Sequence, residues 1–323
     1  MPELPEVETI CRGLRPLVTG RRVAEVEVLQ PRLRVPVSED FCSKLQGKII
    51  LGVERKGKYL LTLLEGEAVW ISHLGMSGKL IYVERDRPRE THDHILVRLD
   101  NGHELRFNDP RRFGLSVIFP VGQLTEWAPL RELGPDPLDR QFNGDYLYSI
   151  ARSSRRRIRD LLIDQRVVAG LGNIYANEIL FRVGIRPTTR AWKLGRDRAG
   201  KIAKLTPRLL REAIRWCGTS FSDYRDAEDR FGEFQNHLRV YDREGETCEA
   251  CASEIKRVAL GNRSAFYCPR CQKQAVLERE IAEFLSCGDP RLTLWEGDQW
   301  LQNDGGCPSA PCFAVKRGLS FTL

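Results

Sequence analysis

The first third of the chain alternates apolar and polar residues with the period of β-strands. Runs rich in β-branched residues occur at 23–29, 48–53, 59–64 and 94–100, separated by glycine-containing turns. Asn101-Gly102 is a typical hairpin signal. Ahead of the strands, apolar residues at 7, 10, 11 and 14 have helical spacing, with Pro5 suited to a first helical position. We therefore expect residues 2–120 to form an antiparallel β-domain with a helix that ends before Pro16.

A helical pattern replaces the strands at 121–238. Asp145 opens one helix, the basic segment RRRIRDLLID at 155–164 predicts a second, and IYANEILFRV at 174–183 predicts a third. The glycine-rich turn AGLGN precedes the third helix. At 197–217 the pattern fits one or two helices, because Pro207 either starts a new helix or kinks a single one.

Four cysteines dominate residues 239–273. Cys248 and Cys251 form one CxxC pair, and Cys268 and Cys271 form another sixteen residues later. This spacing predicts one closed, structural Zn²⁺ site with four thiolate ligands. The intervening residues alternate around Gly261-Asn262, which predicts a hairpin with Arg263 beside its turn. The remaining residues, 274–323, form an extension of unknown role that begins with a helical pattern at 275–285.

Composition places the chain among globular proteins, with 323 residues, 41% hydrophobic and 29% charged. No apolar run approaches the roughly 20 residues of a membrane span, and the start lacks the features of a signal peptide, so we expect no membrane association and an intracellular protein. The net charge of +7 and the arginines at 152–159 favour a polyanionic partner. Taken alone, the arginines fit a solvated helix face equally well.

The amino-terminal residues MPELPEVET suggest a nucleophile. If Met1 is removed, Pro2 becomes a terminal secondary amine, and such α-amines titrate near about 8, against about 10.4 for lysine. A useful fraction of the amine is then unprotonated and able to attack an electrophilic carbon. Glu3 and Glu6 lie close by in the sequence, and Lys58 occupies a turn between two predicted strands. An amino-terminal proline by itself is usually structural, so this chemistry depends on its neighbours.

Six ordered motifs resemble those of the bacterial formamidopyrimidine-DNA glycosylases. They cover about residues 2–273 and read PELPEVET, GKYLL, HLGMSG, NDPRRFG, GLGNIYANE and the four-cysteine segment with NRSAFYCPRCQ. The resemblance implies an α+β multidomain protein with an amino-terminal β-sandwich, a helix-two-turn-helix domain and a β-hairpin zinc finger. Duplex DNA would lie in the cleft between the first two.

The resemblance also implies a bifunctional base-excision enzyme. Pro2 would attack the sugar C1′ of a damaged nucleotide, expel an oxidised purine such as 8-oxoguanine or a formamidopyrimidine, and remain linked as a Schiff base. Glu3 would be the acid/base partner and Lys58 a proton donor in strand cleavage by β,δ-elimination. Arg263 matches the arginine that contacts the target phosphate.

Further residues match DNA contacts of the family. Met76 and Phe113 would fill the gap left by the extruded nucleotide, with Arg111 facing the orphaned cytosine. Asn173 and the amides at its helix start would hold phosphates, as would His92 and Arg111. Arg155 is our match for a phosphate-binding lysine that this chain lacks at the aligned stretch RSSRRR.

Two alternatives stay open from the sequence. An endonuclease VIII-like enzyme would prefer oxidised pyrimidines, although PELPE and the segment 218–241, where the oxidised-purine branch carries a loop over the flipped base, favour purines. A catalytically silent zinc-finger protein would only bind DNA. We expect a monomer that acts on damaged double-stranded DNA in the bacterial cytoplasm, associated with the nucleoid through DNA. Pro207 and the extension depart from the family pattern, and Cys307 and Cys312 are spaced unlike a zinc knuckle.

Overall fold

A computed structural model describes residues 2–220, 225–273, 294–296, 299–301 and 315–316. The chain divides into two compact units, residues 1–275 and 276–323. The second unit contributes the short strands β11 (Leu294–Glu296), β12 (Gln299–Leu301) and β13 (Val315–Lys316) to one sheet. The helix expected at 275–285, and Cys307 and Cys312, lie outside the described residues.

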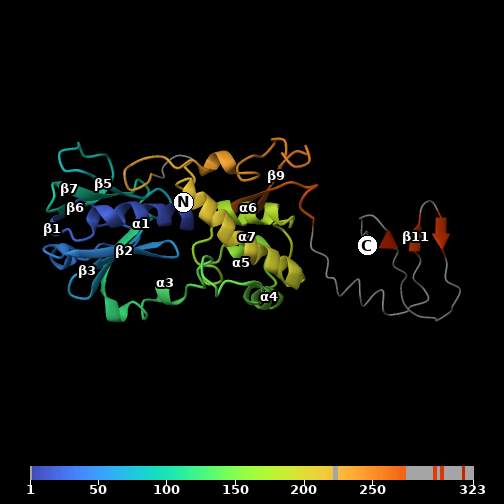
Figure 1. The fold of residues 1–323 in the computed structure, drawn as a ribbon, viewed down its shortest axis with the longest axis horizontal. Helices are drawn as coiled ribbons and strands as arrows, with labels where there is room; N and C mark the ends of the chain where they lie inside the picture. The colour runs from blue at the N-terminus through green and yellow to red at the C-terminus, as the bar shows by residue number, and fades with distance from the viewer. Residues whose placement is uncertain (1, 221–224, 274–293, 297–298, 302–314, 317–323) are drawn as a thin grey trace. The chain divides into compact units, whose positions relative to one another are not determined.

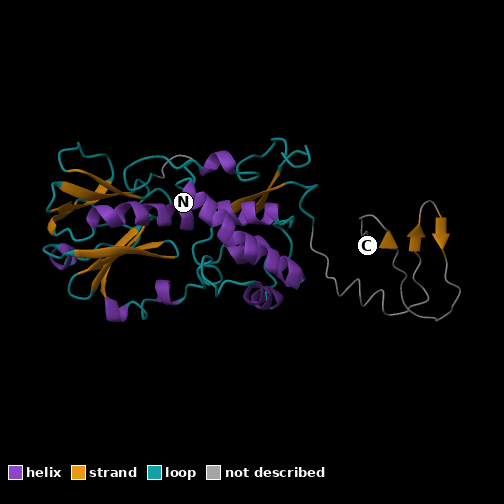
Figure 2. Ribbon diagram, in the orientation of Figure 1, coloured by secondary structure: helices purple, strands orange, loops and turns teal. Residues whose placement is uncertain are grey.

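Two four-stranded antiparallel sheets form a β-sandwich, as the alternating pattern predicts (Figure 2). One sheet has the order β1-β6-β7-β5 and the other β2-β3-β4-β8. The strands are β1 (Val23–Val28), β2 (Ile50–Lys56), β3 (Tyr59–Leu64), β4 (Ala68–His73), β5 (Lys79–Glu84), β6 (Asp93–Leu99), β7 (His103–Asn108) and β8 (Leu115–Pro120). The short helix α2 (Phe41–Leu45) precedes β2. Asn101 and Gly102 turn the chain between β6 and β7, as expected.

Helix α1 (Leu4–Val18) packs its apolar stripe into the core of the sandwich. The prediction that it ends before Pro16 is wrong, because the helix continues through Pro16 to Val18. Proline in the last turn removes a single backbone hydrogen bond, and burial of Leu14 and Val18 offsets that cost. Pro5 lies in the first turn, one residue after the helix begins.

The helical domain buries a separate core of its own. Its helices are α3 (Ala128–Arg131), α4 (Gly144–Arg152), α5 (Ile158–Leu162), α6 (Asn173–Arg182) and α7 (Arg196–Arg215), with 3₁₀ turns at Val121–Gln123, Ala191–Lys193 and Phe234–His237. The basic segment 155–164 is helical only from Ile158 to Leu162. Helix α7 is one helix with Pro207 inside it, which decides between the two alternatives for that segment.

A two-stranded hairpin of β9 (Lys256–Leu260) and β10 (Arg263–Tyr267) turns at Gly261 and Asn262. Figure 1 shows the amino terminus where the strands of the sandwich meet the helices. No helix among the described residues is long and apolar enough to cross a membrane.

Candidate active site and nucleic-acid interface

Pro2 is buried at the point where α1 meets the turn that precedes α6. The N–H of Leu4 donates to the carbonyl of Gly170 at 3.0 Å, so the first residue of α1 is fixed on that turn. The N–H of Glu3 donates to Glu6 Oε2 at 2.8 Å, which closes the start of the helix. These bonds hold the backbone that follows Pro2 in one place.

The carboxylate of Glu3 lies on the amino-terminal end of α6. It accepts the N–H groups of Gly172 at 2.7 Å and Ile174 at 2.9 Å, with a longer contact of 3.4 Å to that of Tyr175. The positive end of the helix dipole stabilises a negative charge there. A Cβ on Gly172 would lie 2.3 Å from the carboxyl carbon, so glycine is required at this position.

This arrangement differs from the expectation that the amides at the start of α6 hold DNA phosphates. Three of these amides, those of residues 172, 174 and 175, are bonded to Glu3. The side chain of Asn173 still faces the cleft, and one of its N–H groups donates to the carbonyl of Ser264 at 2.8 Å. The helix start therefore positions a catalytic candidate.

Glu6 forms a second buried layer beneath Glu3. Its Oε1 accepts the hydroxyl of Tyr175 at 2.5 Å and the N–H of Thr219 at 2.8 Å. Burial raises the pKa of Glu6, and the charge of Glu3 raises it further, although the hydrogen bonds oppose the rise. Sequence reasoning noticed Glu6 only as a neighbour of Pro2. Its partners Tyr175 and Thr219 are 169 and 213 residues away in the chain, so no local pattern could reveal them.

Lys58 occupies the turn between β2 and β3 and is only 4% exposed. Burial lowers the pKa of its ammonium group from the ordinary 10.5, and the positive charge of Arg263 contributes to the fall, while Glu3 and Glu6 act in the opposite direction. Glu3 and Arg263 are thus close enough to Lys58 to influence its pKa.

A cleft of about 490 Å³ brings together residues from four distant segments. Glu3 comes from the start of α1, Met76 from the loop after β4, Asn173 from α6 and Arg263 from the hairpin. The lining residues are Glu3, Met76, Asn173, Ile174, Tyr241, Asp242, Arg257, Asn262, Arg263, Ser264 and Phe266. Four of the predicted site residues, Glu3, Met76, Asn173 and Arg263, therefore share one concave surface, whereas Pro2, Lys58, His92, Arg111, Phe113 and Arg155 are not among its lining residues.

The hairpin is attached to the helical domain by polar contacts. Asn177 accepts the N–H of Phe266 at 2.9 Å, and Arg159 donates to the carbonyl of Leu260 at 2.9 Å. Arg159 is buried, whereas Arg155 is exposed. Sequence reasoning proposed Arg155 as a phosphate contact and did not identify Arg159 as a residue that binds the hairpin. The position of Arg159 within the apolar run of α5 was a signal of its burial.

Two loops at the end of the sandwich present the expected wedge residues. Met76 and Phe113 are 41% and 45% exposed, and the guanidinium of Arg111 lies 4.8 Å from the centre of the Phe113 ring. Asp109 joins the loops, because it accepts the hydroxyl of Ser77 at 2.8 Å and the N–H of Gly114 at 2.7 Å.

His92 lies near these loops in a left-handed backbone conformation, with φ of 76°. Its side chain is exposed, and its carbonyl accepts the N–H of Asp109 at 3.1 Å. His92 is thus fixed to the same aspartate that joins the wedge loops.

Family comparisons match this arrangement in chain order. Family models for the formamidopyrimidine-DNA glycosylase N-terminal domain, the H2TH domain and the zinc finger found in FPG and IleRS match residues 1–116, 133–225 and 245–274. Formamidopyrimidine-DNA glycosylases of Hahella chejuensis and Thioalkalivibrio sulfidiphilus are 44% and 45% identical to this chain, over 84% of it and 100% of their own length. This chain belongs to the formamidopyrimidine-DNA glycosylase family.

Solved structures of this glycosylase family agree. The Lactococcus lactis protein bound to DNA containing N7-benzyl-Fapy-dG has a TM-score of 0.79 and 33% identity, covering 84% of this chain and 100% of that one. A complex of the same protein with DNA containing an abasic site has the same values. The family and the three-part fold expected from the sequence are confirmed. Part of the loop expected over a flipped base, residues 221–224, lies outside the described residues.

The glycosylase zinc finger has a ligand set that fits Zn²⁺. The sulfur atoms of Cys248, Cys251, Cys268 and Cys271 all lie within 4.8 Å of one another. Sulfur atoms at the corners of a tetrahedron with Zn–S bonds of about 2.3 Å are about 3.8 Å apart. The pairs Cys248–Cys271 and Cys251–Cys268 are 3.9 Å and 3.3 Å apart. One structural zinc ion, as predicted, fits these four thiolates.

Proposed function

We propose that this protein excises oxidised purines, such as 8-oxoguanine and formamidopyrimidines, from duplex DNA and then cleaves the strand at the abasic site. Its family acts in base-excision repair as a DNA glycosylase and AP lyase, and the Lactococcus lactis relatives bind Fapy-dG and abasic DNA. The observation that carries the proposal is the buried position of Pro2 directly before Glu3, which lines a cleft together with Arg263.

Pro2 is the nucleophile once Met1 is removed. The lone pair of its secondary amine attacks C1′, and the N-glycosidic bond breaks with its electron pair leaving on the base, which takes up a proton. The nitrogen then loses its proton and forms a C=N double bond to C1′ while the C1′–O4′ bond breaks and O4′ takes up a proton, so that an iminium ion links Pro2 to the opened sugar. Loss of a proton from C2′ breaks the C3′–O3′ bond, a second elimination breaks the C5′–O5′ bond, and hydrolysis releases Pro2.

Glu3 and Lys58 move protons around this nucleophile. The carboxylate of Glu3 is held in place by Gly172 and Ile174, so it is preorganised as the acid/base partner. The lowered pKa of Lys58 makes its ammonium group a stronger acid than a solvated lysine, which suits a proton donor. Arg263, on the rigid hairpin, binds the phosphate of the target nucleotide.

The exposed loops account for nucleotide extrusion. Met76 and Phe113 fill the vacated stack, and Arg111 faces the unpaired cytosine. His92, Asn173 and Arg155 contact backbone phosphates. The protein acts as a monomer in the bacterial cytoplasm, where its DNA substrate lies in the nucleoid.

A direct comparison of lesions tests the proposal. Duplexes that contain 8-oxoguanine opposite cytosine should be incised faster than matched duplexes with thymine glycol opposite adenine. The reverse order would assign the protein to the oxidised-pyrimidine branch. Tight binding without incision of either duplex would identify a catalytically silent DNA-binding protein.

A further inference from the structure

A short segment after α7 leaves the helical domain and packs on the β-sandwich. We call residues 225–230 the strap. Its turn is closed by the buried carboxylate of Asp226, which accepts the N–H groups of Glu228 at 2.9 Å and Arg230 at 2.8 Å, together with Arg230 Nε at 3.0 Å. The strap is therefore a preformed unit.

Ala227 inserts the strap into the core of the sandwich. The residue is 1% exposed and belongs to the apolar cluster that includes Ile10 and Leu14 of α1. A Cβ added at Gly13 would lie 2.8 Å from the Cβ of Ala227, a distance that real side chains do not adopt. Gly13 thus leaves a notch in α1 that the methyl group of Ala227 occupies.

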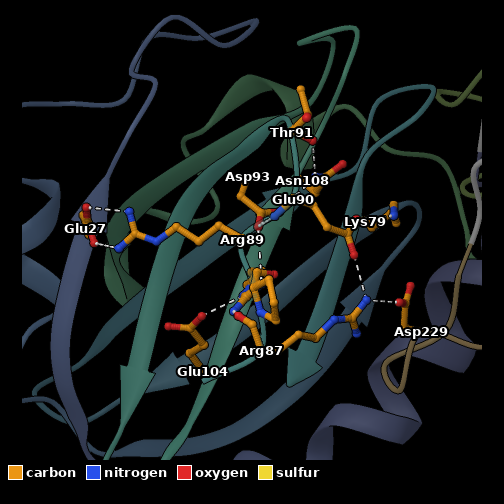
Figure 3. Close-up of polar contacts among 12 residues, drawn as sticks. Glu27, Lys79, Arg87, Arg89, Glu90, Thr91, Asp93, Glu104, Asn108 and Asp229 are labelled. Atoms are coloured by element: carbon orange, nitrogen blue, oxygen red, sulfur yellow. Dashed lines mark hydrogen bonds and ion pairs between the residues drawn. The ribbon is translucent and has the colours of Figure 1, made fainter. Parts of the chain in front are cut away.

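Two polar contacts hold the strap on the same surface. The N–H of Tyr82, on the edge strand β5, donates to the carbonyl of Ala227 at 2.8 Å. The guanidinium of Arg87 pairs with the carboxylate of Asp229 at 2.6 Å, as Figure 3 shows. Buried Arg106 donates to the carbonyls of Arg87 and Pro88, so the loop that presents Arg87 is fixed from beneath.

Described residues before and after the strap contact the end of α7 and the catalytic helix. The N–H of Phe234 donates to the carbonyl of Gly218 at 2.9 Å. The N–H of Thr219 donates to Glu6, whose other oxygen accepts the N–H of Glu3. Glu6 and Gly13 are seven residues apart, so they lie on one face of α1 about 10.5 Å from each other. Residues 218–220, which we call the neck, and the strap therefore contact α1 at two points on that face.

We propose that the packing of the Ala227 methyl group against Gly13, which we call the seat, is a positioning contact for base excision. The seat keeps the strap and the neck in register with the helix that carries Pro2. Displacing Ala227 pulls Thr219 away from Glu6 and loosens the carboxylate that binds the N–H of Glu3. Misplacement of the nucleophile Pro2 strongly lowers the rate of base excision, because the amine must reach a carbon whose position is constrained.

Base excision is more sensitive to this displacement than cleavage of an abasic site. C1′ of an intact nucleotide is held by its base, and the amine must be brought to it. The opened sugar of an abasic site presents an aldehyde that can move toward the amine. The activity assays rest on the proposed function, whereas amide hydrogen exchange measures the seat without depending on that function.

A compensating pair of substitutions tests the seat. Gly13→Ala adds the methyl group that collides with Ala227, while alanine favours the helix, so the variant should still fold. Ala227→Gly in that background removes the other methyl group. The matched control is Gly200→Ala, because Gly200 is a helical glycine of α7 with open space around it. All variants are assayed on duplexes with 8-oxoguanine or a preformed abasic site, with amide hydrogen exchange of β5 followed in parallel.

Gly13→Ala should speed exchange of the Tyr82 N–H and lower excision of 8-oxoguanine by about tenfold, with less than about a twofold change at the abasic site. The double variant should recover both properties, and Gly200→Ala should alter neither.

Unchanged exchange and excision in Gly13→Ala would refute the proposal. A proportional fall of both activities that Ala227→Gly does not restore would also refute it, since the contact would then be merely structural. A wild-type protein inactive on both duplexes would overturn the proposed function, while the exchange data would still decide whether the seat exists.

Discussion

Glu3 and Gly172 are in direct contact across the junction of α1 and α6, with 2.7 Å between the Glu3 carboxylate and the Gly172 N–H. The two residues are 169 positions apart in the chain. Together with the bond from the Ile174 N–H, this contact gives Glu3 a fixed orientation and makes the catalytic end of α1 dependent on the helical domain.

Substitution of Gly172 should therefore disable catalysis without unfolding the protein. The Cβ of Gly172→Ala would lie within 2.4 Å of the Glu3 carboxylate and force it off the helix end. We expect a loss of about 100-fold in kcat/KM for 8-oxoguanine excision, because small displacements of catalytic groups have effects of this size. Gly122→Ala, at a glycine with open surroundings, is the control. Near-normal activity of Gly172→Ala would show that the orientation of Glu3 is unimportant.

Lys58 should set an upper pH limit on strand cleavage. Burial lowers the pKa of its ammonium group below 10.5, so the proton-donating form is present below that lowered value and lost above it. The rate of abasic-site cleavage should fall as the pH rises toward 10, and Lys58→Arg should cleave slowly at every pH, because a guanidinium stays protonated and does not donate its proton. Lys56→Arg, at an exposed lysine two residues earlier, should retain the wild-type profile. A wild-type rate that stays constant across this range would exclude Lys58 as the donor.

Zinc should act by ordering the hairpin, with no part in the chemistry. Four thiolates saturate the ion and leave no position for water. The hairpin buries little apolar area, and without the metal it cannot offset an ordering cost of roughly 1–2 kcal/mol per residue. Cys248→Ser or Cys268→Ser should sharply reduce duplex affinity, measured by fluorescence anisotropy, while the circular dichroism of the sandwich persists.

Cys217→Ser is the matched control for this experiment, because Cys217 lies outside the four-cysteine cluster. A Cys248→Ser protein that binds damaged duplex normally but fails to cleave it would give the metal a catalytic role.

The sandwich was predictable because its signals are local. The strand-like run at residues 59–64, separated by glycine-containing turns, specified β3 with the observed bounds, and Asn101-Gly102 specified the turn between β6 and β7. The hairpin and its four cysteines were likewise encoded by spacing. Pro16 misled the prediction because a proline rule describes backbone preference, whereas burial of Val18 decides where the helix ends.

Contacts between distant segments could not be predicted from the sequence. Glu6 is surrounded by Tyr175 and Thr219, and Arg159 reaches Leu260 across about a hundred residues. Each contact depends on how separate cores pack together. The motifs identified Pro2, Glu3, Lys58 and Arg263 as candidates, but their mutual placement required the folded chain.

Borohydride trapping at Pro2 tests the central claim most directly. The full-length protein is incubated with 8-oxoguanine duplex, reduced, digested and analysed by mass spectrometry, beside a variant that carries one extra residue ahead of Pro2. The account predicts a covalent DNA adduct on the amine of Pro2 in the wild-type protein and none in the extended variant. An adduct on Lys58, or an equal yield of adduct from the extended protein, would contradict it.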